Sequence, residues 1–275
     1  MSGYATQLRS DLTERAVAYA QANGHVTRRS NWESGSVIFR PAFDNRSHGN
    51  FHPASYRAII ARPRWRRRLE KVLTVPERLT RVDDDQRLCE LDSCCSSDAL
   101  LMNVFCHPQV ASSSAVQNLL AIEHEGLPLF GWRARVPLKD GKLDRTEVDM
   151  RIGSLLVESK LTEGSFEPCP AERMNHYERF TAVFRRSELP RTRKQYGCYQ
   201  LLRNVLAADA HRASFCLLTD ARRPDLIESW FRVLAAIRPL ELRLRCKLLT
   251  WQELAPALPS TLQIFLDKKY GIVGH

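Results

Sequence analysis

The sequence predicts an α/β fold in which a central mixed β-sheet is flanked by helices, with a basic and mostly helical N-terminal extension. Two strand-like runs within residues 146–161 meet at a Gly-Ser pair and indicate a tight β-hairpin. From about Ser113 onward, the expected order of elements is helix, strand, strand, strand, helix, strand. We therefore expect a basic N-terminal region over residues 1–90 and a sheet-containing domain over residues 91–275.

The charge balance favours a polyanionic partner. The 275 residues include 41 Lys plus Arg against 31 Asp plus Glu, a formal net charge of +10. Hydrophobic residues make up 44% of the chain and charged residues 26%, as in globular proteins. Nucleic acid is the simplest polyanion for such a surface. The alternative is a basic surface that binds no polyanion.

The cytoplasm is the expected compartment. The N-terminal residues MSGYATQLRSDLTERA lack the apolar core of a signal peptide, and no stretch approaches the length of a membrane span. The 8 cysteines would stay reduced there. Zinc ligation is an alternative for five residues, but C-x-x-C spacing is absent, so buried thiols are expected. The five residues are Cys89, Cys94, Cys95, Cys106 and His107.

The N-terminal extension is expected to begin with a helix over residues 11–22 and to include a short strand at residues 36–40. The segment Arg57–Lys71 follows, with seven basic residues and one acid. A helix here would carry Trp65 and Leu69 on one face and a row of arginines on another.

Three consecutive arginines in this segment are candidates for DNA binding. We expect Arg66, Arg67 and Arg68 to contact backbone phosphates rather than bases. The alternative is a solvated helix face that Trp65 anchors to the core. The two interpretations are compatible, because one face can anchor the helix while the other binds.

The predicted hairpin has a defined register. Gly at the first central position of the Gly153-Ser154 turn suits a type II′ connection. Counting back from the turn places Asp149 opposite Glu158, and Glu147 opposite Lys160. These four side chains then share one side of the sheet, because alternate residues of a strand point to opposite faces.

Two carboxylates side by side repel each other, and a divalent cation removes the conflict. Carboxylate oxygens are what Mg²⁺ prefers, so Asp149 and Glu158 are candidate metal ligands. Lys160 lies two residues beyond the second acid and could position or deprotonate the attacking water and offset charge on a phosphate.

This pattern resembles the signature of the PD-(D/E)XK, or restriction-endonuclease-like, nuclease superfamily. In that signature, an Asp at the end of one strand is followed by Glu-x-Lys on the next, as in Asp149 and Glu158-Ser159-Lys160. Val148 stands where the name of the motif has proline. The alternative is a half-exposed hairpin with an ordinary Glu147–Lys160 ion pair.

The elements on both sides of the hairpin fit the core order of that superfamily. SSDALLMNVF, VESKLTE, YQLLRNVLAA and DKKYGI are also similar to a branch of bacterial restriction-endonuclease-like proteins. Before the hairpin we expect a helix capped by Ser96 or Ser97, a second helix and a strand. The expected later elements are helices at 172–184, 195–209, 224–237 and 261–270, strands at 214–219 and 242–249, and a helix opening at the capping box 250–253.

The resemblance also implies a polar residue on the helix after the Glu-x-Lys strand and an acid from the helix before the sheet. Gln200 fits the first role, with Arg203 and Asn204 on the adjacent turn, and Gln195 with Tyr199 is the competing pair. For the extra acid, the helix before the sheet offers Glu123 and Glu125. Glu163 is left out, because strand alternation places it opposite in parity to Lys160.

The function that the resemblance implies is an Mg²⁺-dependent endonuclease, with Mn²⁺ as a substitute cation, that hydrolyses DNA phosphodiester bonds in restriction, defence or repair. Double-stranded DNA is the expected partner, a homodimer is left open, and no membrane is expected. The first alternative is a non-catalytic DNA-binding or interaction module that retains the fold. A weaker one is an enzyme that acts on RNA or nucleotides.

Overall fold

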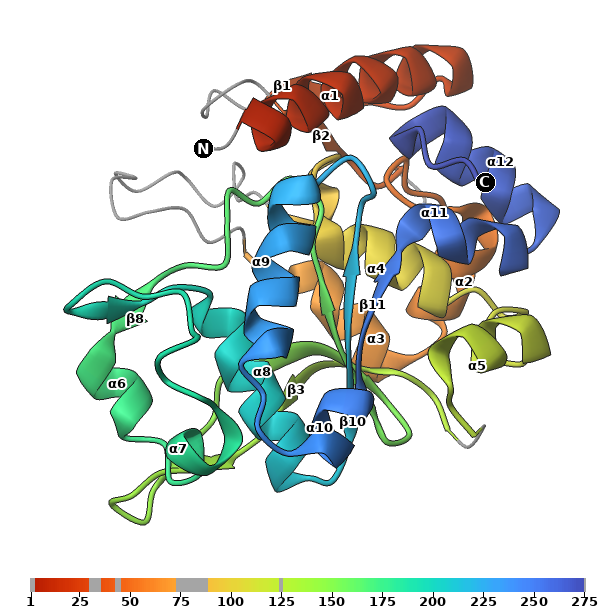
Figure 1. Cartoon of the computed structure of the whole chain (residues 1–275). Coiled ribbons are helices and arrows are strands. Elements are labelled where there is room, and N and C mark those ends of the chain that lie inside the picture. Colours follow the sequence, from red (N-terminus) through yellow and green to blue (C-terminus); the bar gives the residue numbers. More distant parts are fainter. Residues whose placement is uncertain (1–2, 30–35, 43–45, 73–88, 124–125, 275) are drawn as a thin grey trace. The chain divides into compact units, whose positions relative to one another are not determined.

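The structure is a computed structural model that describes residues 3–29, 36–42, 46–72, 89–123 and 126–274 (Figure 1). By packing, the chain divides into two compact units. The sheet unit comprises Met1–Ala5 and Asn118–Trp251, and the helical unit comprises Thr6–Gln117 and Gln252–His275. The region expected at residues 1–90 thus lies mainly in the helical unit, which also contains residues from the C-terminal end.

The sheet unit is built on a five-stranded sheet with the order β11-β10-β7-β6-β3. The strands β3 (Leu129–Arg133), β6 (Glu147–Ile152) and β7 (Leu155–Ser159) run antiparallel to their neighbours in this group. The strands β10 (Ser214–Thr219) and β11 (Cys246–Thr250) continue the sheet from β7 in parallel. The expected mixed sheet is confirmed, and the hairpin supplies its central strand.

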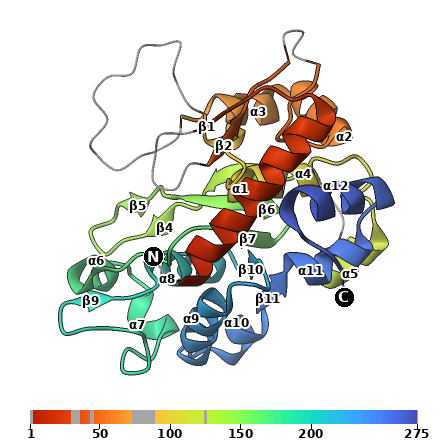
Figure 2. The same cartoon turned by 90° about the horizontal axis from the view of Figure 1, so that it is seen from above.

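Two helices cover one side of this sheet. Helix α8 (Tyr199–Ala210) packs on β7 and β10, and α9 (Pro224–Ala235) packs on β10 and β11. Figure 1 and Figure 2 both show the two helices on the same side. The core beneath them contains apolar side chains from the sheet and both helices, which form one buried cluster. Glu158 points to the same side of the sheet, because its carboxylate contacts Asn204 on α8.

Two of the expected elements of the sheet unit are wrong in part. The expected helix at 172–184 consists of α6 (Ala171–Asn175) and α7 (Phe180–Val183), because the intervening Tyr177 forms a β-bridge with Leu138. The expected strand at 242–249 begins only at Cys246. Its first part belongs to α10 (Leu240–Leu244), whose N-cap is Pro239, and proline before a helix favours its start.

Short elements complete the sheet unit. The strands β4 (Val136–Pro137) and β5 (Leu143–Asp144) pair with each other, as do β8 (Cys169–Pro170) and β9 (Gln195–Tyr196). The expected helix at 195–209 therefore begins four residues later than expected. Helix α5 (Ser114–Leu120) leads from the helical unit into the sheet unit.

The helical unit begins with α1 (Gly3–Asn23) and the two-stranded sheet of β1 (Thr27–Arg29) and β2 (Val37–Phe39). The basic segment is interrupted: α2 (Pro53–Ile60) ends before Pro63, and α3 (Pro63–Arg66) and η1 (Arg67–Glu70) follow. Proline removes a helical hydrogen bond and restricts the residue before it, which explains the break.

The remaining elements of the helical unit are η3 (Glu90–Asp92), α4 (Ser97–Phe105), η4 (Ala255–Ala257) and α12 (Ser260–Tyr270), and α11 (Trp251–Leu254) begins at the boundary of the units. Helix α12 ends as expected at Gly271, whose φ of 60° is left-handed. No helix in the described ranges is long and apolar enough to cross a membrane.

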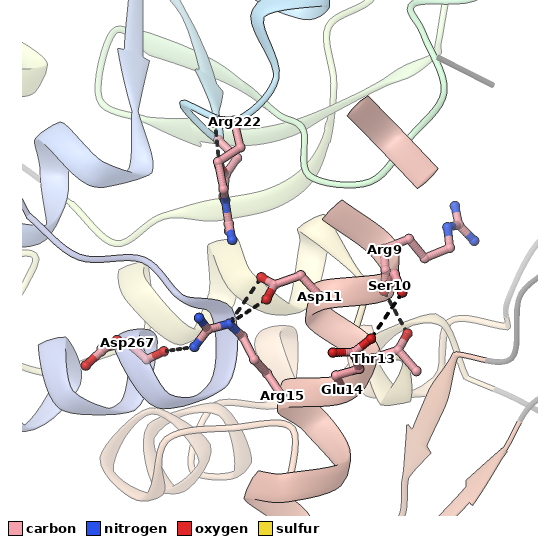
Figure 3. A network of polar contacts seen from close by, with 9 residues as sticks. Arg9, Ser10, Asp11, Thr13, Glu14, Arg15, Arg222 and Asp267 are labelled. Carbon is pink, nitrogen blue, oxygen red and sulfur yellow. Dashed lines mark hydrogen bonds and ion pairs between the residues drawn. The ribbon is translucent and has the colours of Figure 1, made fainter. Parts of the chain in front are cut away.

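One arginine joins the first and last helices of the helical unit. Arg15 Nε contacts both carboxylate oxygens of Asp11 at 3.1 Å, one turn earlier on α1. Its Nη1 donates to the carbonyl oxygen of Asp267 on α12 at 3.1 Å (Figure 3). The guanidinium thus connects segments that are 252 residues apart in the sequence.

The cap of α4 generates a first prediction. Ser96 Oγ accepts the backbone N–H of Ala99 at 3.1 Å, as expected for an N-cap serine. Ser96→Ala should lower the free energy of unfolding by about 1 kcal/mol, because one N–H donor of the first turn loses its acceptor. Ser96→Asn keeps a good cap and should lose much less. Urea unfolding of both variants tests this, and equal losses would contradict the capping role.

Candidate functional site

The hairpin has the expected register. Ile152 pairs with Leu155 and Met150 pairs with Val157, and the next residues along the two strands are Asp149 and Glu158. Of the two turn residues, both within the described ranges, Gly153 has a positive φ of 53° and Ser154 does not, as a type II′ turn requires. Along β6, buried and half-buried residues alternate, with Asp149 on the half-buried face.

Strands β6 and β7 stop pairing through their backbones where the two acids lie. The ladder between them covers Met150–Ile152 and Leu155–Val157. Beyond it, Asp149 Oδ2 accepts the backbone N–H of Ser159 at 2.8 Å, so a side chain replaces a carbonyl as the acceptor. Asp149 is thereby held beside the end of β7, next to Glu158 and Lys160.

Glu158 and Lys160 form a buried ion pair. Lys160 Nζ lies 2.9 Å from Glu158 Oε1, and the two side chains are 6% and 2% exposed. The Lys160 ammonium also lies 5.8 Å from the centroid of the Phe166 ring. Burial alone would lower the pKa of Lys160, but the carboxylates of Glu158, Glu163 and Asp149 outweigh it and raise that pKa. Lys160 is therefore a cation throughout the neutral range.

Glu163 belongs to this cluster, against the expectation from strand alternation. Its Oε2 accepts the backbone N–H of Leu161 at 2.7 Å, and its charge acts on Lys160. The expectation failed because β7 ends at Ser159, and residues beyond the end of a strand no longer alternate between two faces. The feature of the sequence that could have indicated this is that Glu163 follows Lys160 by only three residues.

Helix α8 holds the second oxygen of Glu158. Asn204 Nδ2 donates to Glu158 Oε2 at 2.7 Å, and the Asn204 side chain is fully buried. Arg203 donates through Nε and Nη2 to Asn204 Oδ1, at 3.1 and 2.9 Å. Arg203 Nη2 also donates to the carbonyl oxygen of Glu147 at 2.9 Å, which connects the helix to β6. Asn204 is thus fixed as a donor to Glu158.

A second arginine holds the chain directly after Lys160. Arg223, which is fully buried, donates through Nη1 to the carbonyl oxygen of Leu161 at 2.8 Å. Its Nε and Nη2 donate to the two oxygens of Asp225, each at 2.9 Å. This fork geometry fixes the guanidinium and with it the backbone between Lys160 and Glu163. The sequence shows no pattern that singles out this residue.

The predicted helix residues occupy different places. Gln200 lies on α8 one turn before Asn204, and its buried Oε1 has no hydrogen-bond partner among the described residues. Gln195 lies on β9 and is exposed, so it does not share the α8 face. The helix residue that contacts Glu158 is Asn204.

Of the two predicted extra acids, the described one, Glu123, is not brought to the cluster. The carbonyl oxygen of Glu123 lies 3.8 Å from the place of a Cβ atom on Gly153. That turn is at the opposite end of β6 from Asp149. Glu125 lies outside the described residues.

The carboxylates around Lys160 are oxygen ligands of the kind that Mg²⁺ prefers. Asp149, Glu158 and Glu163 place three negative charges around the single ammonium of Lys160. The described residues contain no group of three or more His, Cys, Asp or Glu side chains that could hold a metal ion. A site with only two protein carboxylates would leave the other positions around Mg²⁺ to water and phosphate oxygens, which is usual for this ion. None of the eight cysteines, all of which lie in the described ranges, forms a disulfide.

The three consecutive arginines divide into two kinds. Arg66 and Arg67 are exposed. Arg68 Nη2 lies 2.8 Å from Asp98 Oδ2, and this carboxylate, 9% exposed, also contacts Lys71. A phosphate contact by Arg68 would compete with that ion pair, whereas Arg66 and Arg67 are open to a partner.

The buried pair generates a second prediction. Lys160→Met removes the cation that offsets three carboxylates and should lower the free energy of unfolding by about 3 kcal/mol at pH 7. Because the folded pKa of Lys160 is raised, wild type keeps this contribution below about pH 10.4 and loses it as the pH rises further. The deficit of the variant should therefore shrink as the pH rises above that value.

Urea unfolding at pH 7 and at a pH above about 10.4 measures this difference. Lys142→Met is the control, since the Lys142 side chain is 80% exposed and pairs with Asp140 at the surface. Equal stabilities of wild type and Lys160→Met would show that the pair is not needed for the fold.

Comparisons with known proteins place the chain in a family. The model of the family REase-ARP, described as "Restriction Endonuclease associating with ARP", matches residues 15–271. No curated protein and no solved structure matches the chain. The match spans both units and contains the cluster around Lys160 and the mixed sheet that carries it. This chain belongs to the REase-ARP family of restriction-endonuclease-associated proteins.

Proposed function

We propose that the sheet unit is an Mg²⁺-dependent endonuclease of the PD-(D/E)XK type that hydrolyses DNA phosphodiester bonds, with Mn²⁺ as a substitute cation. The observation that carries this proposal is the buried Lys160–Glu158 pair beside Asp149, at the place where β6 and β7 part. A family related to restriction endonucleases and the net charge of +10 support DNA as the substrate.

In this proposal Asp149 and Glu158 hold the cation. Bound Mg²⁺ would polarise the phosphate and lower the pKa of water. Asp149 offers a half-buried carboxylate whose Oδ2 already accepts one N–H, from Ser159. Glu158 is oriented by Asn204 on one oxygen and Lys160 on the other, so its carboxylate is fixed before any ligand arrives.

Lys160 acts as a hydrogen-bond donor and a positive charge rather than as a base. Its raised pKa keeps the ammonium protonated, so it cannot take a proton from water at neutral pH. It can orient the attacking water and stabilise the charge that develops on the phosphate oxygens. Glu163, half-buried and close enough to act on Lys160, is the acceptor that we assign to the proton of that water.

The alternative is a DNA-binding or interaction module without activity. The observation that favours it is the low exposure of the site, since Lys160 is 5% and Glu158 2% exposed. Substrate would have to approach from the side of Asp149 and Glu163, which are half-buried.

Double-stranded DNA as the partner, and a homodimer as the acting form, are further parts of the proposal.

Cleavage by matched variants is the third prediction. Lys160→Met should reduce plasmid cleavage at least about 100-fold, because the lysine acts on the reacting groups rather than on bound duplex. Asp149→Asn should reduce cleavage as strongly by a different route, since it removes a ligand charge while keeping an acceptor for the Ser159 N–H. Calorimetry should show that Mg²⁺ or Mn²⁺ binding falls in Asp149→Asn and survives in Lys160→Met.

The controls for this experiment are EDTA, which should stop wild-type cleavage, and Lys142→Met, which should cleave like wild type. Circular dichroism must show that each variant is folded at the assay temperature. If Lys160→Met cleaves as fast as wild type, the role assigned to Lys160 is wrong. If wild type binds DNA but cuts neither plasmid nor oligonucleotide with any divalent cation, the non-catalytic alternative holds.

The exposed arginines generate the fourth prediction. The double variant Arg66→Gln with Arg67→Gln should weaken binding to unrelated duplexes alike and lower the slope of log affinity against log salt by about 2. Fluorescence anisotropy over a salt series measures both effects. The matched control is the double variant Arg28→Gln with Lys268→Gln, which removes two other exposed charges of the helical unit. Equal slopes in the two double variants would show that charge alone matters, not this segment.

A further inference from the structure

A pocket in the helical unit contains two histidines and an arginine that the proposed function does not use. The pocket has a volume of about 460 Å³ and lies where α2 and α12 begin and α4 has just ended. His52, Arg57, His107, Gln109 and Thr261 are among the residues that line it. No acidic side chain is among the described residues of its wall.

The two histidines are nearly buried and face each other. His52 is 8% and His107 4% exposed, and their ring centroids are 5.1 Å apart. The His52 ring also lies 5.6 Å from that of Phe265 on α12. Packing on both sides fixes the His52 ring, while its edge belongs to the wall of the pocket.

The hydrogen bonds of the rings determine which nitrogen carries the proton. His52 Nδ1 accepts the backbone N–H of Ala54, and His107 Nδ1 accepts that of Gln109, both at 3.3 Å. Each Nδ1 therefore presents a lone pair, and each neutral ring carries its proton on Nε2. Neither Nε2 forms a hydrogen bond to another described residue in the structure. Two N–H donors are thus left for a ligand.

This tautomer argues against a metal ion. A cation bound at Nε2 needs the lone pair of that nitrogen, and the neutral ring would then carry its proton on Nδ1. At Nδ1 of His52 and His107 that proton would point at the N–H of Ala54 or Gln109. The rings are arranged to donate outward, which suits an acceptor of negative charge.

The surrounding charges point the same way. Arg57 adds an exposed guanidinium to the wall of the pocket. The pocket also includes Pro53 and Ala54 in the first turn of α2 and Thr261 in the first turn of α12, and the N-terminal end of a helix is its positive end. Donors from three segments thus surround the same space.

We propose that this pocket is a binding site for a tetrahedral oxyanion, a free phosphate or sulfate or the phosphate group of an ester. The Nε2–H groups of His52 and His107 and the guanidinium of Arg57 are its donors. The site is separate from the acids of the sheet unit and does not depend on nuclease activity.

Binding should be linked to protonation of the histidines. Burial, with the charges of His107 and Arg57, lowers the pKa of His52 to about 4, and burial lowers the pKa of His107. His107 and Arg57 are the charged groups that act on His52 from the surrounding elements. A bound anion favours the charged form of each ring, so both pKa values should rise on binding and affinity should increase as the pH falls.

The test is calorimetry of the full chain with sulfate, which does not titrate in this range, from about pH 8 to about pH 5. Wild type should bind one sulfate more tightly as the pH falls, and NMR of the histidine ring nitrogens should show both pKa values rising. His52→Asn keeps an acceptor for the Ala54 N–H, because Asn is a good N-cap, but removes the Nε2 donor. It and Arg57→Gln should each weaken binding at least about tenfold.

Arg64→Gln is the control, since Arg64 is exposed in the same unit and does not line the pocket. Inorganic phosphate and oligonucleotides with and without a 5′-phosphate distinguish a free anion from an ester. If the phosphorylated oligonucleotide binds more tightly than the unphosphorylated one, the ligand of the pocket is a phosphate ester. If inorganic phosphate binds more tightly than either, the ligand is the free anion. The proposal is overturned if sulfate does not bind, or if Arg64→Gln weakens binding as much as the two pocket variants.

Discussion

The buried contact between Lys160 and Glu158 is the interaction on which the sheet unit depends most. Removing either partner would leave an uncompensated charge far from water, which is strongly destabilising. The pair in turn needs its neighbours in place: Asn204 for the second oxygen of Glu158, and Arg223 for the backbone after Lys160. The position of α8 on the sheet is therefore linked to the electrostatics of the site.

Local sequence patterns predicted the central part of the fold. The Gly153-Ser154 turn determines the pairing of its two strands, so the register from Met150 to Val157 could be counted from it. Ser96 as a helix cap and Gly271 as a helix stop were readable for the same reason, since each acts on the residues next to it. Predictions of this kind need no knowledge of distant contacts.

The parts that were missed depend on contacts distant in the sequence or on the end of a regular element. Asn204 reaches Glu158 across 46 residues and Arg223 reaches Leu161 across 62, distances over which periodicity carries no information. Glu163 was misplaced because alternation was extended past the last residue of β7. The helix expected through Pro63 was interrupted by proline, which fixes φ whatever the apolar pattern favours.

The connectivity of the two units has a consequence for how the protein is made. The residues of the sheet unit from Asn118 to Trp251 are continuous, whereas the helical unit is assembled from two segments on either side of them. All residues of the sheet unit are therefore synthesised before α12. In the helical unit, Arg15 on α1 can donate its hydrogen bond to the carbonyl oxygen of Asp267 only after that residue has been synthesised. A chain cut after Trp251 would keep every residue of the sheet unit but lose α12 from the helical unit, and such an incomplete unit is a substrate for chaperones and proteases.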